Sequence, residues 1–499
     1  MTLGQLYVVL LVAGLVLIVS IAGARLAARL GLPSLLLFLA LGMILGEDAI
    51  GFDFDNAQTA QNIGIAALGV ILVEGGLTTR WSDVRPVLAP AGVLAVVGVG
   101  ISVGVTAAGA HLLLGLDWQL ALLLGAIMSS TDAAAVFAVL RDLPVPRRLA
   151  GVLEAESGFN DAPTVILVTL FATVPLAEAG LVQIAGNLVY QLVFGAGIGI
   201  AVGRLGVAAL RRVALPAVGL YPVTAFGLGI VAFAAAGAAQ ASGFIAAYLA
   251  ALIMGNAGLP HRLATRSFAE GLGWLAQVGL FVLLGLLITP SELGSELLAA
   301  LVIGGVLALV ARPLSVVASL APFRIDWREQ VFVSWAGLRG AVPIVLATIP
   351  IVAGVPGGDQ VLNIVFVAVV VFTLIQGPSL PALARRLGLS SASAVQELAV
   401  EAAPLDKLGA ELLTFSVPAD SHLPGVAIWE LRLPSIGVVT LVVRAGESFV
   451  PRPDTRLAAD DEVLVVTTSQ AREQTEKRLR AVADRGKLAR WFANLMDRE

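Results

Sequence analysis

Residues 153–167 of the chain, LEAESGFNDAPTVIL, decide the fold. Three carboxylates stand within eight residues, yet the segment around them is apolar and long enough to cross a membrane. Ser157, Asn160 and Asp161 are spaced three and four residues apart, so their oxygens share one face of a helix. An ionisable group inside a membrane helix is costly and is therefore a functional candidate. Carboxylate, hydroxyl and amide oxygens suit a hard cation, and a carboxylate can hold a proton instead.

The composition places the surrounding chain in a lipid bilayer. Of the 499 residues, 58% are hydrophobic and 13% are charged, whereas soluble proteins carry roughly 25% charged residues. Charge gathers at the C-terminal end, where 28 of the last 99 residues are charged against 38 of the first 400. We therefore expect a membrane part followed by a small soluble domain. The net charge of −4 gives no basic surface for nucleic acid, and the absence of cysteine excludes disulfides and thiolate metal sites.

Apolar segments predict about thirteen transmembrane helices in an all-α, multi-pass membrane protein. The expected ranges are 6–28, 33–46, 60–77, 88–114, 118–140, 149–173, 182–210, 217–239, 242–257, 268–288, 295–320, 329–352 and 361–384. Loops that contain arginine alternate with acidic or neutral loops along the whole series. The positive-inside rule makes the basic side cytoplasmic. The N-terminus is then outside the cell (inner or plasma) membrane, and the C-terminal domain is in the cytoplasm.

Polar residues interrupt two of these segments. SSTD at 129–132 separates two apolar halves, and WAGLRGAVPIV at 335–345 places glycines and Arg339 ahead of a proline. Unwound backbone is tolerated at membrane depth where it lines a cavity, and paired interruptions mark transporter sites. Seven crossings separate the two segments, so they run in opposite directions. We therefore expect inverted repeats with crossed broken helices.

Three more ionisable residues lie inside predicted helices: Glu74 in LVEGGL, Arg312 and Arg339. A buried arginine stays charged and needs a carboxylate partner. Glu156 or Glu74 is the expected partner of Arg339, while Arg312 either pairs in the same way or reaches the cytoplasmic surface. The GAGIG stretch at 195–199 predicts close helix packing. No nucleophile–base pair or metal cluster emerges, so neither an enzyme nor a bound cofactor is predicted.

The interrupted segments and the polar cluster together resemble a known transporter family. SSTDAAAVFAVL (129–140), ESGFNDAPTVIL (156–167) and GLRGAVPIVLA (337–347) match, in order and spacing, three signature segments of the monovalent cation/proton antiporters of the NhaP-like and NHE-like group. The resemblance covers roughly residues 1–390. It implies a homodimer of 13-helix protomers in the bilayer, with crossed broken helices beside the ion site.

The same resemblance implies a role for each polar residue. Asp161 is the carboxylate that binds the cation and the proton by turns. The other implied cation ligands are Thr131, through its carbonyl, Asp132 and Ser157. Glu156 and Arg339 are implied to form a structural ion pair, with Glu74 and Arg312 as a secondary network.

Asn160 occupies the position where electrogenic relatives have a second aspartate, and no lysine precedes Lys407. Both features favour electroneutral exchange. With one titrating carboxylate, the site carries the same charge with either ligand. Transport then does no work against the membrane voltage, which would be about 2.3 kcal/mol per charge per 100 mV.

From about residue 408 the pattern changes to short strands in a small α+β domain. ELLTFSV, GVVTLVVRAG and DEVLVVTT are the expected strands, LPGVAIWELRL is a turn with a short helix, and the whole resembles the TrkA-C (RCK-C) domain. The usual glycine before its aspartate is replaced by Asp460. The expected organisation is a transmembrane exchanger at 1–390, a linker at 391–407, a TrkA-C-like regulatory domain at 408–470 and an amphipathic charged tail at 471–499, for which a solvated helix is favoured over packing on the domain.

These observations predict a secondary antiporter that exchanges a monovalent cation for protons by alternating access and contributes to pH homeostasis. Potassium is favoured over sodium because TrkA-C domains regulate potassium channels and transporters, often by binding a small regulator between paired domains. A dimerisation module without a ligand is the alternative for that domain. For the whole chain, the alternatives are a cation channel, although no filter like TVGYG is present, a sodium-selective or electrogenic antiporter, and a cation-coupled carrier of an organic solute.

Overall fold

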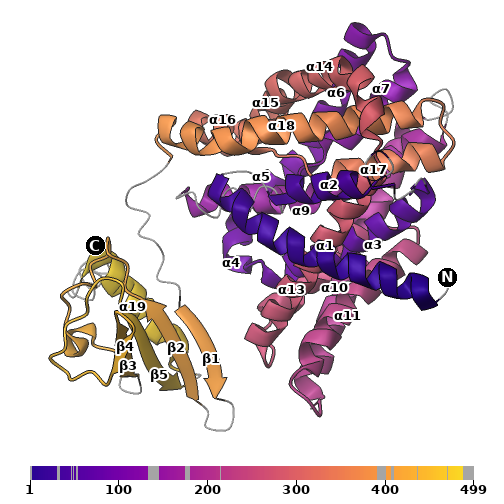
Figure 1. The fold of residues 1–499 in the computed structure, drawn as a ribbon. Helices are drawn as coiled ribbons and strands as arrows, with labels where there is room; N and C mark the ends of the chain where they lie inside the picture. The colour runs from indigo at the N-terminus through magenta and orange to yellow at the C-terminus, as the bar shows by residue number, and fades with distance from the viewer. Residues whose placement is uncertain are drawn as a thin grey trace. The chain divides into compact units, whose positions relative to one another are not determined.

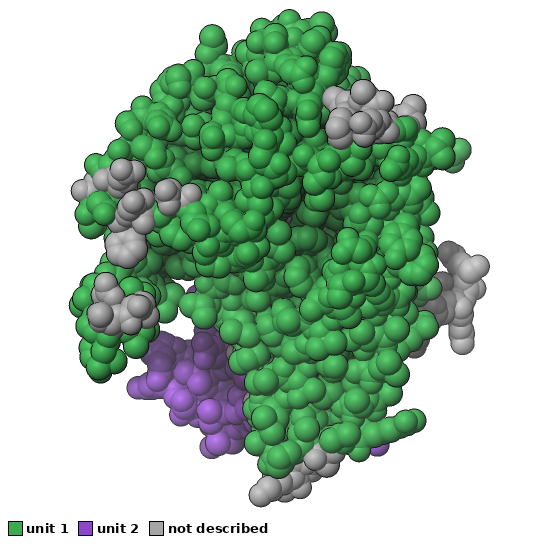
Figure 2. All heavy atoms as spheres, turned by 90° about the vertical axis from the view of Figure 1, so that its right-hand side faces the viewer, with its two compact units in different colours: residues 1–389 green, residues 390–499 purple. Residues whose placement is uncertain are grey.

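The fold divides into two compact units, residues 1–389 and residues 390–499, which Figures 1 and 2 distinguish. The computed structural model describes residues 3–30, 34–46, 48, 50–51, 54, 56–132, 145–174, 180–213, 215–389, 400–405, 410–434, 437–468 and 470–486. Parts of five predicted segments lie outside these residues: 33 of the second span, 133–140 of the fifth span, 391–399 and 406–407 of the linker, 408–409, 435–436 and 469 of the regulatory domain, and 487–499 of the tail.

Apolar helices build the first unit. They are α1 Leu3–Leu30, α2 Ser34–Leu45, α3 Ala57–Thr78, α4 Trp81–Val84, α5 Leu88–Val93, α6 Val99–Leu114, α7 Trp118–Ser129, α9 Arg147–Thr173, α10 Leu181–Arg212, α11 Leu220–Ala238, α12 Gly243–Asn256, α13 Arg262–Leu286, α14 Leu297–Val306, α15 Arg312–Leu320, α16 Trp327–Ala336, α17 Ala341–Val352 and α18 Gly358–Arg386. Polar side chains cap the starts of α3 and α7. The Asn56 side chain accepts from the Thr59 amide at α3, and Asp117 accepts from the Gln119 amide at α7.

Many of these helices are suited to a membrane. Among the described residues, eight helical segments are long and apolar enough to cross a bilayer, and α16 with α17 forms a further span bent by 53°. The apolar helices α2, α7 and α12 are shorter. Each coincides with a predicted span, as does α9, which carries the polar cluster. The multi-pass helical architecture is confirmed, while the total of thirteen spans stays a prediction.

Helix contacts separate the first unit into two groups. Helices α1, α2, α3 and α10 to α13 pack together, and α4 to α7, α9 and α14 to α18 form the second group (Figure 1). Small residues bring α10 close to α12. A Cβ on Gly195 or Gly199 would lie 2.6 Å from the backbone oxygen of Ser242 or Ala246. The close packing predicted for GAGIG is therefore confirmed.

Two spans of the second group share an unusual feature. Trp81–Leu114 and Pro290–Phe323 are each 34 residues long. Each contains a five-residue π-helical turn, η2 at Leu94–Gly98 and η4 at Leu307–Ala311. Such turns are rare and mark functional sites. The two spans are the fourth and eleventh of the predicted series, seven crossings apart, so the shared π turn supports an inverted repeat.

The second unit is a five-stranded antiparallel sheet with strand order β1-β2-β5-β3-β4. The elements are β1 Val400–Leu405, β2 Ala410–Ser416, the short 3-10 helix η7 Ile428–Leu431, β3 Val438–Arg444, β4 Glu447–Phe449, β5 Glu462–Thr468 and α19 Arg472–Arg485. Ala445 and Gly446 both have positive φ, as a two-residue hairpin between β3 and β4 requires. The three expected strands and the short helix are present.

Two expectations for this unit were wrong. Residues 400–405 form β1 on β2, inside the range expected to be a linker. Their sequence, VEAAPL, contains a proline and lacks the β-branched, alternating run that predicts a strand. Helix α19 is not a solvated helix, since Leu479 and Val482 are fully buried with the core of the sheet. Asp460 has φ of 64°, a left-handed conformation that glycine adopts freely and aspartate tolerates.

The turn that ends at Asp461 is held by one buried carboxylate. Arg444 donates through Nε and Nη2 to the two carboxylate oxygens of Asp461 at 2.7 Å, and the Ala458 amide donates at 2.7 Å. Burial alone would raise the pKa of Asp461. The hydrogen bonds from Arg444 and Ala458 and the charge of Arg444 outweigh burial and lower the pKa below its ordinary value of 3.8.

We expect Asp461→Asn to destabilise the second unit by about 1–3 kcal/mol, because it weakens charge-assisted hydrogen bonds to a buried group. Because the folded pKa is lowered, the carboxylate stabilises the fold above pH 3.8 and loses this effect as the pH falls through the folded pKa. Hydrogen exchange of the β5 amides in the intact protein measures both effects. Asp454→Asn, at an exposed position, is the matched control. Equal exchange in the two variants would contradict the prediction.

Candidate functional site

The two interrupted segments meet inside the first unit. Helix α7 ends at Ser129 and the chain continues extended through residues 130–132, while α16 and α17 are separated by residues 337–340. The Asp132 amide donates to the Leu338 carbonyl at 3.0 Å, so the unwound strands pair directly. The predicted interruption of the second span is confirmed. The first span stops being helical at the predicted SSTD, and its continuation lies outside the described residues.

Asp132 neutralises the start of a half-helix. Its Oδ2 accepts from the Ala341 amide at 3.0 Å, at the first residue of α17. A helix N-terminus carries partial positive charge and unpaired amides, so a carboxylate is favourable there. Gly340 makes this approach possible, because a Cβ at that position would overlap the Asp132 carboxylate.

Arg339 performs the opposite task. Its Nε donates to the Met128 carbonyl at 2.7 Å, in the last turn of α7, and its Nη1 donates to the Gly337 carbonyl after α16. Both carbonyls belong to helix ends with partial negative charge. Thr373 of α18 donates to the Arg339 carbonyl at 2.8 Å and fixes the backbone. We call the place where residues 130–132 meet residues 337–340 the crossing. Its helix ends are balanced by one carboxylate, Asp132, and one guanidinium, Arg339.

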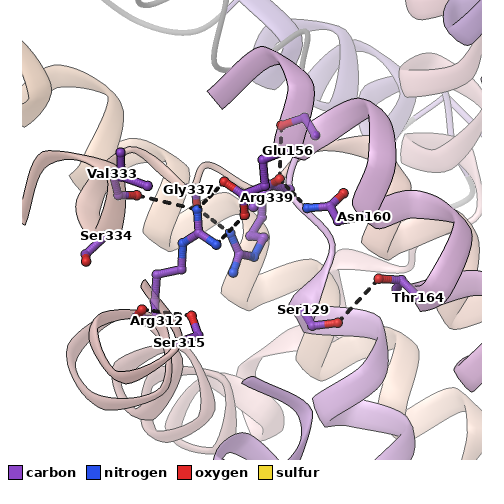
Figure 3. A network of polar contacts seen from close by, with 12 residues as sticks. Ser129, Glu156, Asn160, Thr164, Arg312, Ser315, Val333, Ser334, Gly337 and Arg339 are labelled. Atoms are coloured by element: carbon purple, nitrogen blue, oxygen red, sulfur yellow. Dashed lines mark hydrogen bonds and ion pairs between the residues drawn. The ribbon is translucent and has the colours of Figure 1, made fainter. Parts of the chain in front are cut away.

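One face of α9 lies against Ser129, the last residue of α7, and the unwound residues 130–131. The residues of that face are spaced 3, 4 and 7 positions from the first, as a single helical stripe requires. The contacts, of which Figure 3 shows the first, are Ser129 Oγ to Thr164 Oγ1 at 3.4 Å, Ser130 Oγ to Asp161 Oδ1 at 2.7 Å, Thr131 Oγ1 to Ser157 Oγ at 3.0 Å and Asn160 Nδ2 to Thr131 Oγ1 at 2.6 Å. The structure therefore brings Thr131, Ser157, Asn160 and Asp161 together, as the sequence predicts.

Asp161 is the group with unbalanced charge at this site. Its side chain is 6% exposed, and Ser130 donates its hydrogen bond. No lysine, arginine or histidine of the described residues forms an ion pair with it. A buried ionised carboxylate without a counter-charge is strongly unfavourable. The carboxylate of Asp161 therefore needs a proton or a cation. The Oδ1 atom of Asn160, also buried, has no hydrogen-bond partner and is a second available oxygen.

The predicted ion pair between Glu156 and Arg339 was wrong in its partner. Arg312 of α15 donates through Nη1 and Nη2 to the two carboxylate oxygens of Glu156, the second at 2.7 Å. Figure 3 shows the two side chains facing each other, and both are buried. Arg339 does not pair with Glu156 because its guanidinium donates to the Met128 and Gly337 carbonyls instead. The same contact settles the two alternatives for Arg312, which pairs with a carboxylate and does not reach the surface.

Two further residues complete the comparison with the sequence. Ser130, which donates to Asp161, was not among the predicted site residues. The sequence does contain a signal for Ser130. Neighbouring residues of an extended segment point in opposite directions, so Ser130 and Thr131 face different partners. Glu74 packs against Gly273 of α13. A Cβ added at Gly273 would lie 2.7 Å from the Cγ atom of Glu74. Its membership of the secondary network stays a prediction.

Known proteins match both units of the chain. The family described as "Sodium/hydrogen exchanger, transmembrane" matches residues 16–386, and the TrkA-C domain matches residues 412–480. The K(+)/H(+) antiporter NhaP of Alkalimonas amylolytica is 39% identical over 466 residues, which cover 92% of this chain and 80% of that protein. The K(+)/H(+) antiporter NhaP2 of Shewanella oneidensis is 34% identical over 498 residues, which cover 97% of this chain and 85% of that protein.

Two more distant matches add to the comparison. The Na(+)/H(+) antiporter ApNhaP of Aphanothece halophytica is 32% identical over 339 residues, covering 64% of this chain and 63% of that protein. The solved structure of the sodium proton antiporter MjNhaP1 from Methanocaldococcus jannaschii superposes with a TM-score of 0.66 at 22% identity. It covers 78% of this chain and 100% of that chain. The MjNhaP1 match supports the helical architecture of the first unit.

We expect Gly340→Ala to lower the thermal unfolding midpoint of the detergent-solubilised protein. The added Cβ displaces the Asp132 carboxylate and leaves the Ala341 amide unpaired, at a cost of about 1–3 kcal/mol. Gly305→Ala in α14 is the matched control, because a Cβ there meets nothing within 4 Å. Equal midpoints for both variants would show that the close approach at Gly340 is unimportant.

The buried pair of Glu156 and Arg312 predicts strong coupling in a double-mutant cycle. Glu156→Gln or Arg312→Gln alone leaves one buried charge unpaired, at a cost of about 3–5 kcal/mol. The double variant removes both charges and should be less destabilised than the sum of the single variants. Thermal unfolding of the four proteins measures this coupling. Additive losses would mean that Glu156 does not depend on Arg312.

Proposed function

This chain belongs to the sodium/hydrogen exchanger family and is a membrane cation/proton antiporter, a secondary transporter and not an enzyme; we propose that it exchanges one potassium ion for one proton at Asp161. The observation that carries the proposal is the burial of the Asp161 carboxylate, which is 6% exposed and whose hydrogen bond comes from a neutral hydroxyl. A proton or a cation removes the cost of that charge equally well. The two ligands compete for one group, which is the requirement for exchange.

The neighbouring oxygens suit a cation that has lost most of its water. Ser157 presents a hydroxyl, and the unpaired Oδ1 of Asn160 presents an amide oxygen. Because the Thr131 hydroxyl is engaged by Asn160 and Ser157, we assign its carbonyl as the ligand. Asp132 contributes negative potential while its Oδ2 caps α17. Potassium is the substrate of the exchange in this account and no resident cofactor takes part.

Electroneutral exchange follows from the charge balance of the crossing. Asp132 faces a helix N-terminus, Arg339 faces helix carbonyls, and Glu156 is paired with Arg312. These charges stay constant through the cycle, so only Asp161 changes its ligand. Asn160 adds no second titrating group. The loaded site then has the same net charge with a proton as with a potassium ion, and membrane voltage does not drive either step.

The relatives support potassium as the cation. Those named as potassium/proton antiporters match 92% and 97% of this chain, a range that includes its TrkA-C domain. The relative named as a sodium/proton antiporter matches 64%. The TrkA-C domain is regulatory, and we propose that it binds a small cytoplasmic regulator.

Topology and assembly complete the proposal. The alternation of basic and acidic loops supports a cell-membrane protein with the N-terminus outside and the second unit in the cytoplasm. We propose a homodimer, and alternating access in which the group containing α9 and the crossing moves against the group of α1 to α3 and α10 to α13. The two groups meet where α9 and α17 contact α3, α10, α12 and α13.

The purified protein in proteoliposomes, with a pH dye inside, tests this function. We expect potassium to drive proton flux better than sodium, and Asp161→Asn to abolish the flux with either ion because the competing group is lost. Asp359→Asn, at an exposed position near the start of α18, is the matched control and should keep full flux. Cation movement that needs no proton movement and survives Asp161→Asn would replace the antiporter with a channel. Flux driven better by sodium would overturn the potassium assignment alone.

A further inference from the structure

A groove of about 600 Å³ opens between α15, α16 and α18, away from the ion site. Its walls are mostly apolar. Leu309, Val317 and Trp327 line it and are 66%, 52% and 60% exposed. In a multi-pass membrane protein, such large exposed apolar side chains on a spanning helix lie against lipid. The groove therefore opens toward the bilayer.

The polar groups of the groove are satisfied from within the protein. Trp335 Nε1 donates to Ser379 Oγ at 2.7 Å, Gln330 Nε2 donates to the Ile325 carbonyl at 2.8 Å, and Ser334 Oγ donates to a backbone carbonyl at 2.7 Å. The groove therefore offers an occupant a dry, apolar interior with few hydrogen bonds to make. An acyl chain fits this chemistry better than a polar solute.

Positive charge stands at one end of the groove. Arg386, in the last turn of α18, is the charged residue among those that line it, and no acidic residue of the described part lines it. The Arg328 guanidinium lies 5.7 Å from the centroid of the Trp327 ring, and Trp327 is a groove wall. Among the described residues, no carboxylate forms an ion pair with either arginine. Asp326 and Glu329 flank Arg328 in sequence and reduce, without cancelling, the basic charge of Arg324, Arg328, Arg385 and Arg386.

We propose that this groove binds one anionic phospholipid, with an acyl chain between α15, α16 and α18 and the phosphate at Arg386 and Arg328. An apolar slot that ends in guanidinium groups complements a molecule with an apolar tail and an anionic head. A lipid is also the occupant that the bilayer supplies at this surface. The proposed topology places the groove in the cytoplasmic leaflet.

The lipid would lie against a part of the exchange machinery. Helix α16 is one half of the broken span, and it forms a wall of the groove through Trp327, Val331 and Trp335. Arg312, which is paired with Glu156, also contacts α16 by donating to the Val333 carbonyl at 3.5 Å. An occupied groove therefore supports α16 from the lipid side. This second step rests on the proposed function, whereas binding of the lipid does not.

Native mass spectrometry of the full chain tests binding, with phosphatidylglycerol and phosphatidylcholine as probes. We expect phosphatidylglycerol to be retained preferentially, and Arg386→Gln to weaken its retention about fivefold, the effect of one basic residue near a membrane surface. Arg385→Gln removes the same charge from the neighbouring position, which does not line the groove, and should change retention little. Ala382→Trp fills the groove and should displace the lipid without altering charge.

Three outcomes would overturn the site. They are equal retention of both lipids, equal losses in Arg385→Gln and Arg386→Gln, and retention that is unaffected by Ala382→Trp. Cross-linking of the groove to a second copy of the chain or to its own C-terminal tail would also exclude the lipid. Proton flux in vesicles with increasing phosphatidylglycerol tests, separately from binding, whether the bound lipid affects exchange through α16. We expect stimulation in the wild type and Arg385→Gln but not in Arg386→Gln, and binding without stimulation would reject the coupling alone.

Discussion

The first unit depends on the pairing of two unwound strands inside an apolar helical bundle. Helices that stop at membrane depth expose partial charges and unpaired backbone groups at their ends, and lipid offers no partner for them. Asp132 meets the start of α17, while Arg339 meets the ends of α7 and α16. The backbone bond from Asp132 to Leu338 then holds the strands together. Two ionised side chains within the membrane are thereby engaged by helix ends.

This balance gives Asp161 its special position. Each of the other buried charges at the crossing has a fixed opposite charge or a helix end. The Asp161 carboxylate has the Ser130 hydroxyl, so its charge must be met by something that comes from outside the protein. The stripe of Ser157, Asn160 and Asp161 on α9 brings further oxygens to the same place. In the function we propose, a cation and a proton compete for this one residue while the other charges at the site stay constant.

Much of this arrangement could be predicted from the sequence because it depends on the spacing of residues that are close in the chain. Periodicity identifies the face of α9, and interruptions at SSTD and GLRG identify the unwound strands. Partner choice could not be predicted, since Arg312 and Arg339 are both buried arginines and only the packing of α15 decides that Glu156 pairs with Arg312. The short strand β1 and the buried face of α19 were missed for a related reason. Strand β1 forms only through backbone pairing with β2, and the apolar residues of α19 acquire a burial partner only through tertiary contacts with the sheet.

We propose that one constant-charge site exchanges a single potassium ion for a single proton. The most direct measurement is the null point of transport in proteoliposomes, where potassium and proton gradients are imposed in the same direction and flux is followed under clamped voltage. We expect zero net proton flux whenever the two concentration ratios are equal, at every voltage. A null point that moves with voltage would show that net charge is carried, and would contradict both the one-to-one exchange and the constant charge at Asp161.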